Sequence, residues 1–394
     1  RLKWQPIDGL RIENSARYGN AHNSYVNTGA RAATRSLLDP VAPGAVDATL
    51  DNGHQGWQEV SYYVDQLNIY GDFTLGGMKH QLIVGAEFSD HKVRNGVYGL
   101  TNSGARNCIT GNALTANSWC ILNGVTDIAT LTQRTIVKGT WDSDWEVRTK
   151  SAYLMDTVDV TRWLTLFAGV RMDSFDYSNT IQNTNTLVQT PNRYSDTIWN
   201  FHAGVSVKPG DDGNIYLAFG TSSEINGGES DLGSNCGYGG ICSLPGAAGV
   251  GDGRPERVTN IELGTKWELF DHRLLLTAAA FRLVKNDVFE TGSPDSYADA
   301  GSLNTGKHRV QGVEIGFVGN ITSRLSGQAS VTLMDSKILR SNDLDIPAAT
   351  LLAFPDATNV DRKLSNFANN QANLLLRYQV TDAFALGGAA NYKS

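Results

Sequence analysis

Strict alternation of apolar and polar side chains between Asn260 and Leu269 constrains the fold of this chain more than any other feature. The apolar face carries Ile261, Leu263, Thr265, Trp267 and Leu269. The polar face carries Asn260, Glu262, Gly264, Lys266 and Glu268. A period of two over this length predicts an extended strand with two unlike faces. Asp271 and His272 interrupt the pattern before a second long strand begins at Arg273, which predicts a hairpin.

Hairpins of this kind recur along the whole chain, and short turns alternate with long connections. Turn signals such as Asp8-Gly9 and Gly76-Gly77 supply the backbone conformations that tight turns require. The pattern predicts about fourteen antiparallel strands. The predicted strands cover residues 1–7, 10–20, 66–75, 81–89, 145–159, 164–177, 194–208, 214–222, 260–269, 273–285, 310–318, 325–333, 373–380 and 384–392. No linker or low-complexity tract divides the 394 residues, so residues 1–394 are expected to form one domain.

Alternation alone does not say which solvent lies on each face. In a soluble sandwich the apolar faces of two sheets pack together, whereas in an outer-membrane barrel the apolar face meets lipid and the polar face lines the lumen. The predicted strands often exceed the roughly five or six residues usual in soluble sheets, and they can cross a bilayer at a tilt. Aromatic residues near strand ends are typical of an interfacial girdle: Trp57, Tyr62, Tyr63, Trp163, Trp267 and Tyr378. An all-β transmembrane antiparallel β-barrel is therefore favoured, with a soluble sandwich as the alternative.

Charge and motifs argue against several classes of function. The net charge of -7 argues against a general nucleic-acid binder, which would carry a basic stripe. No run approaches the roughly 18 apolar residues that a membrane-spanning helix needs. The chain has no GxSxG, HExxH or P-loop motif, so it is not expected to be an enzyme and no catalytic residue is predicted. Its histidines are scattered, and they are expected to be turn, loop or lumen residues.

The four cysteines fall in two close pairs within stretches rich in Gly, Asn and Ser. We expect the disulfides Cys108–Cys120 and Cys236–Cys242, because local pairing in such loops is typical of an oxidising compartment. Free thiols and a metal site remain alternatives, although no His lies near either pair at zinc-ligand spacing.

Several short motifs occur in order along the chain, and together they resemble strands of the TonB-dependent outer-membrane receptors. Pro255-Glu256, Asn260, Glu262-Leu263-Gly264 and Lys266 are similar to that family's PE…N…ELGxK strand. Further similar motifs are Ala168-Gly169-Val170-Arg171 with Asp173, Lys208-Pro209 with 215–219, Gln311-Gly312-Val313-Glu314, and Leu364, Asn366, Asn373 and Tyr378. The resemblance is strongest to the siderophore-receptor branch, and Lys79–Tyr98 points to ferric catecholate receptors.

The resemblance implies a 22-stranded outer-membrane barrel closed by an N-terminal plug, of which about fourteen strands are present here. Because the chain begins at Arg1 without Met, we expect an internal piece, with the plug and both ends of the barrel missing. The implied function is import of a ferric siderophore with energy relayed by TonB–ExbB–ExbD. Outer-membrane lipid and lipopolysaccharide are further implied partners, and the full-length receptor is expected to be monomeric. Alternatives are a receptor for haem, cobalamin or an oligosaccharide, and a passive porin or structural barrel.

An anionic, aromatic ferric complex would be bound by guanidinium groups and by the faces of aromatic rings. Candidate ligand-binding residues in the long loops and the outer lumen are Tyr98, Arg106, Trp119, Arg134, Trp141, Tyr238, Arg254, Tyr297 and Arg340. Neither a cofactor nor a protein metal ligand is expected, because the resemblance implies iron that arrives chelated by the siderophore. In the first hairpin, Leu263 should face lipid, Glu262 should face the lumen, and Asp271-His272 should form a periplasmic turn.

Overall fold

Fourteen antiparallel strands form one continuous sheet, as the alternation predicted. The computed structural model describes residues 1–26, 45–49, 55–102, 118–122, 125–126, 134–225, 255–290, 303–341, 359–364 and 367–394. The main sheet has the order β1-β2-β4-β5-β8-β9-β10-β11-β12-β13-β14-β15-β16-β17, so each strand pairs with its neighbours along the chain. This meander is the topology of an up-and-down β-barrel wall.

The first seven strands of the main sheet are β1 (Leu2–Ile7), β2 (Leu10–Val26), β4 (Gln55–Leu75), β5 (Met78–Asn102), β8 (Arg134–Thr161), β9 (Leu164–Gln182) and β10 (Gln189–Gly210). The other seven are β11 (Gly213–Glu224), β12 (Glu256–Leu269), β13 (Leu274–Glu290), β14 (Leu303–Asn320), β15 (Leu325–Arg340), β16 (Asn370–Thr381) and β17 (Phe384–Lys393). A second sheet pairs β3 (Ala45–Thr49), β6 (Ser118–Leu122) and β7 (Val125–Thr126). The sequence patterns did not predict this small sheet, whose strands are short.

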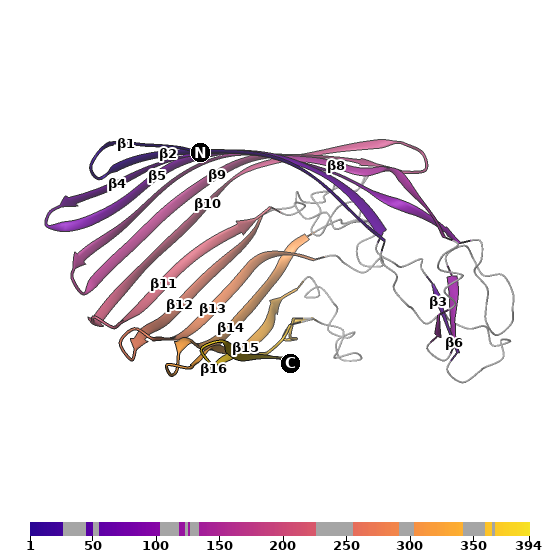
Figure 1. Ribbon diagram of the computed structural model, residues 1–394. Helices are drawn as coiled ribbons and strands as arrows, with labels where there is room; N and C mark the ends of the chain where they lie inside the picture. The colour runs from indigo at the N-terminus through magenta and orange to yellow at the C-terminus, as the bar shows by residue number, and fades with distance from the viewer. Residues whose placement is uncertain are drawn as a thin grey trace, which may run out of the picture.

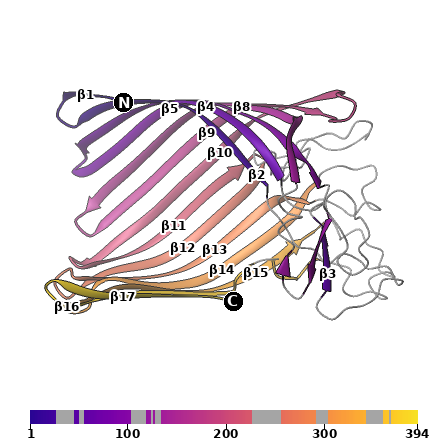
Figure 2. The same ribbon diagram turned by 45° about the vertical axis from the view of Figure 1, so that its right-hand side comes forward.

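The main sheet curls into a trough with an inner and an outer face (Figures 1 and 2). Within the described residues, β1 pairs only with β2 and β17 only with β16, so the sheet has two open edges. The short turns that join β4 to β5 and β12 to β13 lie at one end of the trough. The small sheet lies at the other end, where β2, β5, β11 and β13 end and where the intervals to the next strand of the main sheet are longer. This asymmetry matches the periplasmic and extracellular ends of outer-membrane barrels.

The outer face is a continuous apolar surface. On β12, Ile261 is 49% exposed and Leu263 is 54% exposed, and similar values hold for large apolar residues on the other strands. The polar side chains of β12 face inward, where Glu262 accepts a hydrogen bond from the Tyr216 hydroxyl at 2.6 Å. The predicted orientation of this hairpin is therefore confirmed. The turn at Asp271-His272 is also confirmed, and both residues have positive φ angles near 60°.

Aromatic rings on the inner face lie over glycines of neighbouring strands. A Cβ atom added to Gly85 would lie 2.2 Å from the Tyr153 ring, and one added to Gly264 would lie 2.4 Å from the Tyr216 ring. Aromatic rings that cover strand glycines in this way help to fix the register of a sheet. The inner wall therefore depends on glycine at these positions.

The predicted lengths of two strands and the girdle position of two aromatic residues were wrong. β5 has 25 residues and β8 has 28, far more than the roughly ten that cross a bilayer, so both strands continue well beyond the apolar surface. Trp57 lies in β4, where it pairs with Gly96 in the extension of β5. It is 5% exposed beneath Lys138, whose Nζ is 3.9 Å from the ring centroid. Tyr62 faces the inside of the trough. These two residues therefore do not belong to an interfacial girdle, whereas Tyr63, Trp163 and Tyr378 are exposed as a girdle requires.

No α-helix in the described part of the chain is long and apolar enough to cross a membrane. The described residues also contain no group of three or more His, Cys, Asp or Glu side chains that could hold a metal ion.

Candidate functional site

Six aromatic side chains gather on the inner face, toward the end with the long connections. We call this group the aromatic panel; its members are Tyr62, His91, Trp145, Phe175, Tyr177 and Tyr194. They come from five consecutive strands of the main sheet, β4, β5, β8, β9 and β10. Residues directly paired across antiparallel strands share a face, and the register pairs Tyr62 with His91 and Tyr177 with Tyr194. The register of the sheet therefore assembles the panel.

Five of the six rings contact one another, in a group of three and a pair. His91 and Trp145 meet edge to face with centroids 5.2 Å apart, and Trp145 and Tyr177 stack at 6.3 Å. Phe175 and Tyr194 lie 5.5 Å apart. These separations are typical of stabilising aromatic pairs.

The panel has a buried floor and an accessible margin. Trp145, Phe175 and Tyr177 are at most 3% exposed, and they form an apolar cluster with Val93 and Ile198. His91 is exposed, while Tyr62 and Tyr194 are half-buried. A ligand in the trough could therefore touch the margin, while the floor fixes the positions of the rings.

Arg17 supplies a positive charge beside the margin of the panel. Its guanidinium carbon lies 5.3 Å from the centroid of the Tyr62 ring, and its side chain is exposed. No ion-pair partner of Arg17 lies within 4.0 Å among the described residues. An exposed guanidinium next to an aromatic ring can bind an anionic aromatic group by charge and by stacking.

Buried amides and a hydroxyl lie on the rim side of the panel. The Gln58 side chain donates to Asn95 at 3.1 Å, and the Ser143 hydroxyl donates to Asn179 at 3.1 Å. Asn95, Ser143 and Asn179 are at most 2% exposed. Because these groups are buried and bonded to one another, they hold the strands together and offer little to a ligand.

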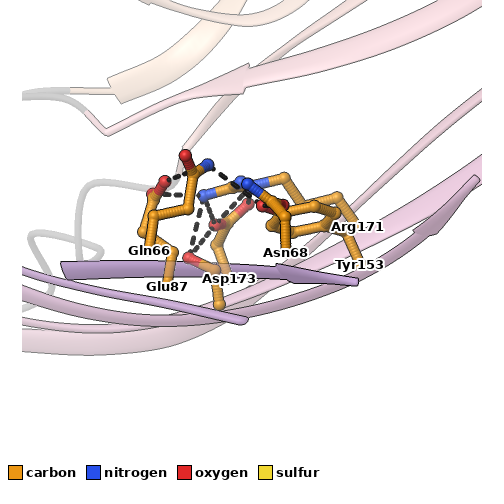
Figure 3. A network of polar contacts seen from close by, with 7 residues as sticks. Gln66, Asn68, Glu87, Tyr153, Arg171 and Asp173 are labelled. Atoms are coloured by element: carbon orange, nitrogen blue, oxygen red, sulfur yellow. Dashed lines mark hydrogen bonds and ion pairs between the residues drawn. The ribbon is translucent and has the colours of Figure 1, made fainter. Parts of the chain in front are cut away.

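A charged network lies on the other side of the panel, closer to the short turns (Figure 3). Arg171 reaches Glu87 and Asp173, each at 2.8 Å, and donates to the Ser151 hydroxyl at 2.9 Å. Its guanidinium carbon also lies 5.2 Å from the Tyr153 ring centroid. Two carboxylates thus compensate one guanidinium, so the network leaves an excess negative charge on the inner wall.

The Tyr153 hydroxyl extends the network to strand β4. It donates to Asn68 at 2.5 Å and accepts from Gln66 at 3.0 Å, and the Gln66 amide also donates to Glu87 at 3.1 Å. Figure 3 shows these side chains converging above the inner surface of the sheet. The network therefore joins β4, β5, β8 and β9 at the level below the aromatic panel.

The sequence-predicted ligand residues are not brought together by the described structure. Tyr98 and Trp141 lie in strands β5 and β8 rather than in loops, and the Trp141 ring centroid is 5.9 Å from the Arg94 guanidinium. Arg340 ends β15, on a different part of the wall. Arg134 and Trp119 fall within β8 and β6, but their side chains lie outside the description. The predicted residues Arg106, Tyr238, Arg254 and Tyr297 lie outside the described residues, as do the side chains of all four cysteines.

The sequence patterns placed the ligand residues mainly in loops and did not predict the aromatic panel, which lies on the strands. A signal for it was present. On β9, Phe175 and Tyr177 continue the face that carries Arg171 and Asp173, so large rings occupy positions where a lumen-facing strand should be polar.

The sequence of the whole chain, residues 1–394, matches the family described as "TonB dependent receptor-like, beta-barrel". It is 28% identical over 400 residues to the probable TonB-dependent siderophore receptor PiuA of Acinetobacter baumannii, covering 100% of this chain and 50% of that protein. It is 24% identical over 412 residues to the catecholate siderophore receptor Fiu of Escherichia coli K12, covering 98% of this chain and 48% of that protein. The chain thus spans about half the length of these relatives.

Solved structures show the same fold. The crystal structure of PiuA from Acinetobacter baumannii matches with a TM-score of 0.78 at 24% identity, covering 99% of this chain and 53% of that one. The closed form of the ferric-catecholate import receptor Fiu from Escherichia coli K12 matches with a TM-score of 0.72 at 21% identity, covering 99% of this chain and 52% of that one.

Proposed function

Because the chain belongs to the TonB-dependent receptor β-barrel family, a family of outer-membrane transport receptors, we propose that it forms barrel wall of a receptor that imports a ferric siderophore. The name of PiuA supports a siderophore as the cargo, and the name of Fiu favours the catecholate type. The family resemblance expected from the sequence motifs is confirmed. The cargo and the transport activity of this protein belong to the proposal, which rests on the inner surface of the wall.

The observation that carries the proposal is the aromatic panel with Arg17 at its margin. A ferric catecholate complex presents negative charge and flat aromatic rings on its surface. Tyr62, His91 and Tyr194 offer ring faces, and Arg17 offers a charge 5.3 Å from the Tyr62 centroid. Contacts of this kind contribute about 0.5–2 kcal/mol each, so three or four together supply a useful part of the binding free energy.

The excess of carboxylates below the panel supports a direction of passage. An anionic complex held at the panel would meet Glu87 and Asp173 as it moved inward, with only Arg171 to offset them. Like charges at this level oppose spontaneous entry. The proposal therefore includes energy supplied through TonB, which the family name implies, together with ExbB–ExbD, rather than passive diffusion through a pore.

The remaining parts of the proposal follow from the same chemistry. The protein binds and moves its ligand without changing it, so it acts as a receptor rather than an enzyme. Iron is held by the siderophore, and the wall supplies no metal ligand or cofactor. The intact receptor is monomeric and is surrounded by outer-membrane lipid and lipopolysaccharide.

Neighbouring tyrosines on opposite faces provide the decisive experiment. In the intact receptor, Tyr62→Ala should weaken binding of a ferric catecholate by about fivefold to tenfold, because it removes the Tyr62 ring and leaves Arg17 without its cation–π contact. Tyr63→Ala is the matched control, since Tyr63 is the next residue and points to the outer face. Binding is measured by quenching of intrinsic fluorescence. Equal affinities in the two variants would contradict a ligand site at the panel.

Competing ligands test the proposed cargo separately. The same titration with haem, cobalamin and a neutral oligosaccharide should give much weaker binding than the ferric catecholate. Tighter binding of one of these compounds, sensitive to Tyr62→Ala, would keep the site and overturn the siderophore assignment.

A further inference from the structure

The inner face of β2 and β4 carries a second pair of an arginine and a tyrosine, below the aromatic panel. The Arg11 guanidinium carbon lies 4.1 Å from the centroid of the Tyr70 ring, closer than the 5.3 Å between Arg17 and Tyr62. Arg11 and Arg17 are an even number of residues apart on β2, and so are Tyr62 and Tyr70 on β4, so both pairs share one face. The inner wall therefore repeats the same cation–π arrangement at two levels.

The lower pair lies close to the short turns. Arg11 is the second residue of β2, next to the Asp8-Gly9 turn, and the Asp72 amide donates to the Gly9 carbonyl at 2.7 Å. At a rise of about 3.3 Å per residue, Arg11 and Arg17 are about 20 Å apart along the strand. A ligand bound at the panel must therefore move along the wall to reach the lower pair.

A surplus of positive charge surrounds the lower pair. The Glu13 carboxylate is 4% exposed and forms ion pairs with three cations: Arg1 at 2.5 Å, Lys3 at 3.2 Å and Arg11 at 3.6 Å. No other carboxylate forms an ion pair with these cations in the described part of the chain. One carboxylate cannot neutralise three cations, and all three side chains are exposed, so this part of the wall attracts anions.

Apolar side chains continue the surface beside Tyr70. The register pairs Tyr70 with Ile83 on β5, and Ile83 with Met155 on β8. Directly paired residues share a face, so the tyrosine ring and two apolar side chains form one row at the level of Arg11. A flat aromatic ligand can lie on such a row while its negative charge meets the cations.

The lower pair lies beyond the carboxylates that oppose entry. The register places Ser15 of β2 at the level of Glu87, across β4, so β2 presents a neutral hydroxyl there. Glu13, the next residue on this face of β2, is more than compensated by its cations. An anion that moves inward along β2 therefore leaves the cation Arg17 and reaches the cation Arg11 without passing an uncompensated carboxylate on that strand.

We propose that Arg11, Lys3 and Tyr70 form a second ligand site, which receives the anionic aromatic ligand after it has passed the level of Glu87. This inference rests on the proposed function, because a ferric catecholate combines the negative charge and the flat rings that the site fits. The aromatic panel binds the ligand first. The lower site then stabilises the ligand on the inner side of the carboxylates, which speeds its passage.

Binding and uptake separate the two sites in the intact receptor. Affinity for a ferric catecholate is measured by fluorescence quenching of purified receptor, and uptake is measured with the radioactive iron complex in cells with energised TonB. Arg11→Gln and Tyr70→Leu should leave the affinity unchanged, because the panel sets it, and should lower the initial rate of uptake about threefold to tenfold. Arg11→Lys and Tyr70→Phe keep the charge and the ring, so each should retain most of the uptake.

Folding and a matched control make the comparison specific. In Arg11→Gln, Glu13 keeps Arg1 and Lys3 as partners, so the variant should fold, which heat-modifiable mobility on gels checks. Arg377→Gln is the control, because Arg377 is another exposed cation near a short turn, the one between β16 and β17, and its uptake should be unchanged. An equal loss of uptake in the control would overturn the second site.

The remaining outcomes decide between one site and two. Unchanged uptake in Arg11→Gln and Tyr70→Leu would overturn the inference and leave the proposed function standing. A loss of affinity as large as that of Tyr62→Ala would also overturn it, because the two pairs would then form a single site. Absence of uptake by the unmodified receptor would overturn the proposed function, and the second site with it.

Another segment of the receptor is the rival occupant of this surface. Passive entry of a bulky antibiotic into cells without TonB tests for it. If Arg11→Gln raised this entry, Arg11 would be holding part of the receptor in place, and the ligand assignment would be overturned. Unchanged passive entry together with slower uptake supports a ligand site.

Discussion

Arg171 on β9 lies 2.8 Å from Glu87 on β5, and it connects these strands across β8, which lies between them. Arg171→Met should lower the free energy of unfolding by about 1–3 kcal/mol, because Glu87 and Asp173 would then face each other without a cation. Urea unfolding of the intact receptor in detergent measures the change. Arg377→Met is the control, since no ion pair of Arg377 within 4.0 Å is found among the described residues; a similar loss there would mean that the network adds nothing specific.

A methyl group on Gly85 has no room beneath the Tyr153 ring, because its carbon would lie 2.2 Å from ring atoms. Gly85→Ala should therefore destabilise the barrel by about 1–3 kcal/mol as the ring is displaced. Gly220→Ala is the matched control, because a Cβ there would meet nothing within 4 Å. The melting temperature, followed by the loss of heat-modifiable mobility on gels, should fall for the first variant only.

The turn at His272 should make stability depend on pH. A hydrogen bond and the negative charge of Glu268 raise the pKa of His272 above its ordinary value of 6.5. The pair therefore stabilises the fold fully below pH 6.5, and this contribution is lost as the pH rises through the raised pKa. Glu268→Gln should lower the melting temperature at pH 6 and leave it unchanged at pH 9. In a His272→Gln background the same change should have no effect at either pH; an effect there would exclude the pair as the cause.

A charge introduced on β12 should distinguish the lipid-facing side of the strand from its lumen-facing side. Leu263→Arg puts a guanidinium on the outer face, where a basic residue within the apolar band costs about 2–4 kcal/mol. Glu262→Arg, at the next position, loses the bond to Tyr216 but keeps its charge in the wet interior. The yield of folded receptor in outer-membrane fractions should fall strongly for Leu263→Arg and little for Glu262→Arg. The reverse order would contradict the assigned faces.

Much of the wall could be predicted because strand alternation is a local signal. The faces of β12, the turn at Asp271-His272 and the number of strands in the main sheet all follow from patterns within a few residues. The lengths of β5 and β8 did not follow. Beyond the lipid band a strand no longer needs an apolar face, so the alternation fades at Arg134–Asp144 although the ladder continues.

The candidate site depends on register, which a single strand does not reveal. Tyr62 and His91 become neighbours only because β4 and β5 pair in one particular register, and Tyr177 reaches Tyr194 by the same rule. Sequence reasoning could name ring and charge types but could not place them together.

The unequal strand lengths have a consequence for how a ligand arrives. β8 has 28 residues and β12 has 14, so the wall that carries the aromatic panel extends much farther from the short turns than the wall around β12. A molecule diffusing toward the barrel has a larger chance of first contact with the taller wall. A molecule held on this wall diffuses in two dimensions along its surface rather than in three dimensions through solution. Its path along the strands ends at Arg17 and Tyr62.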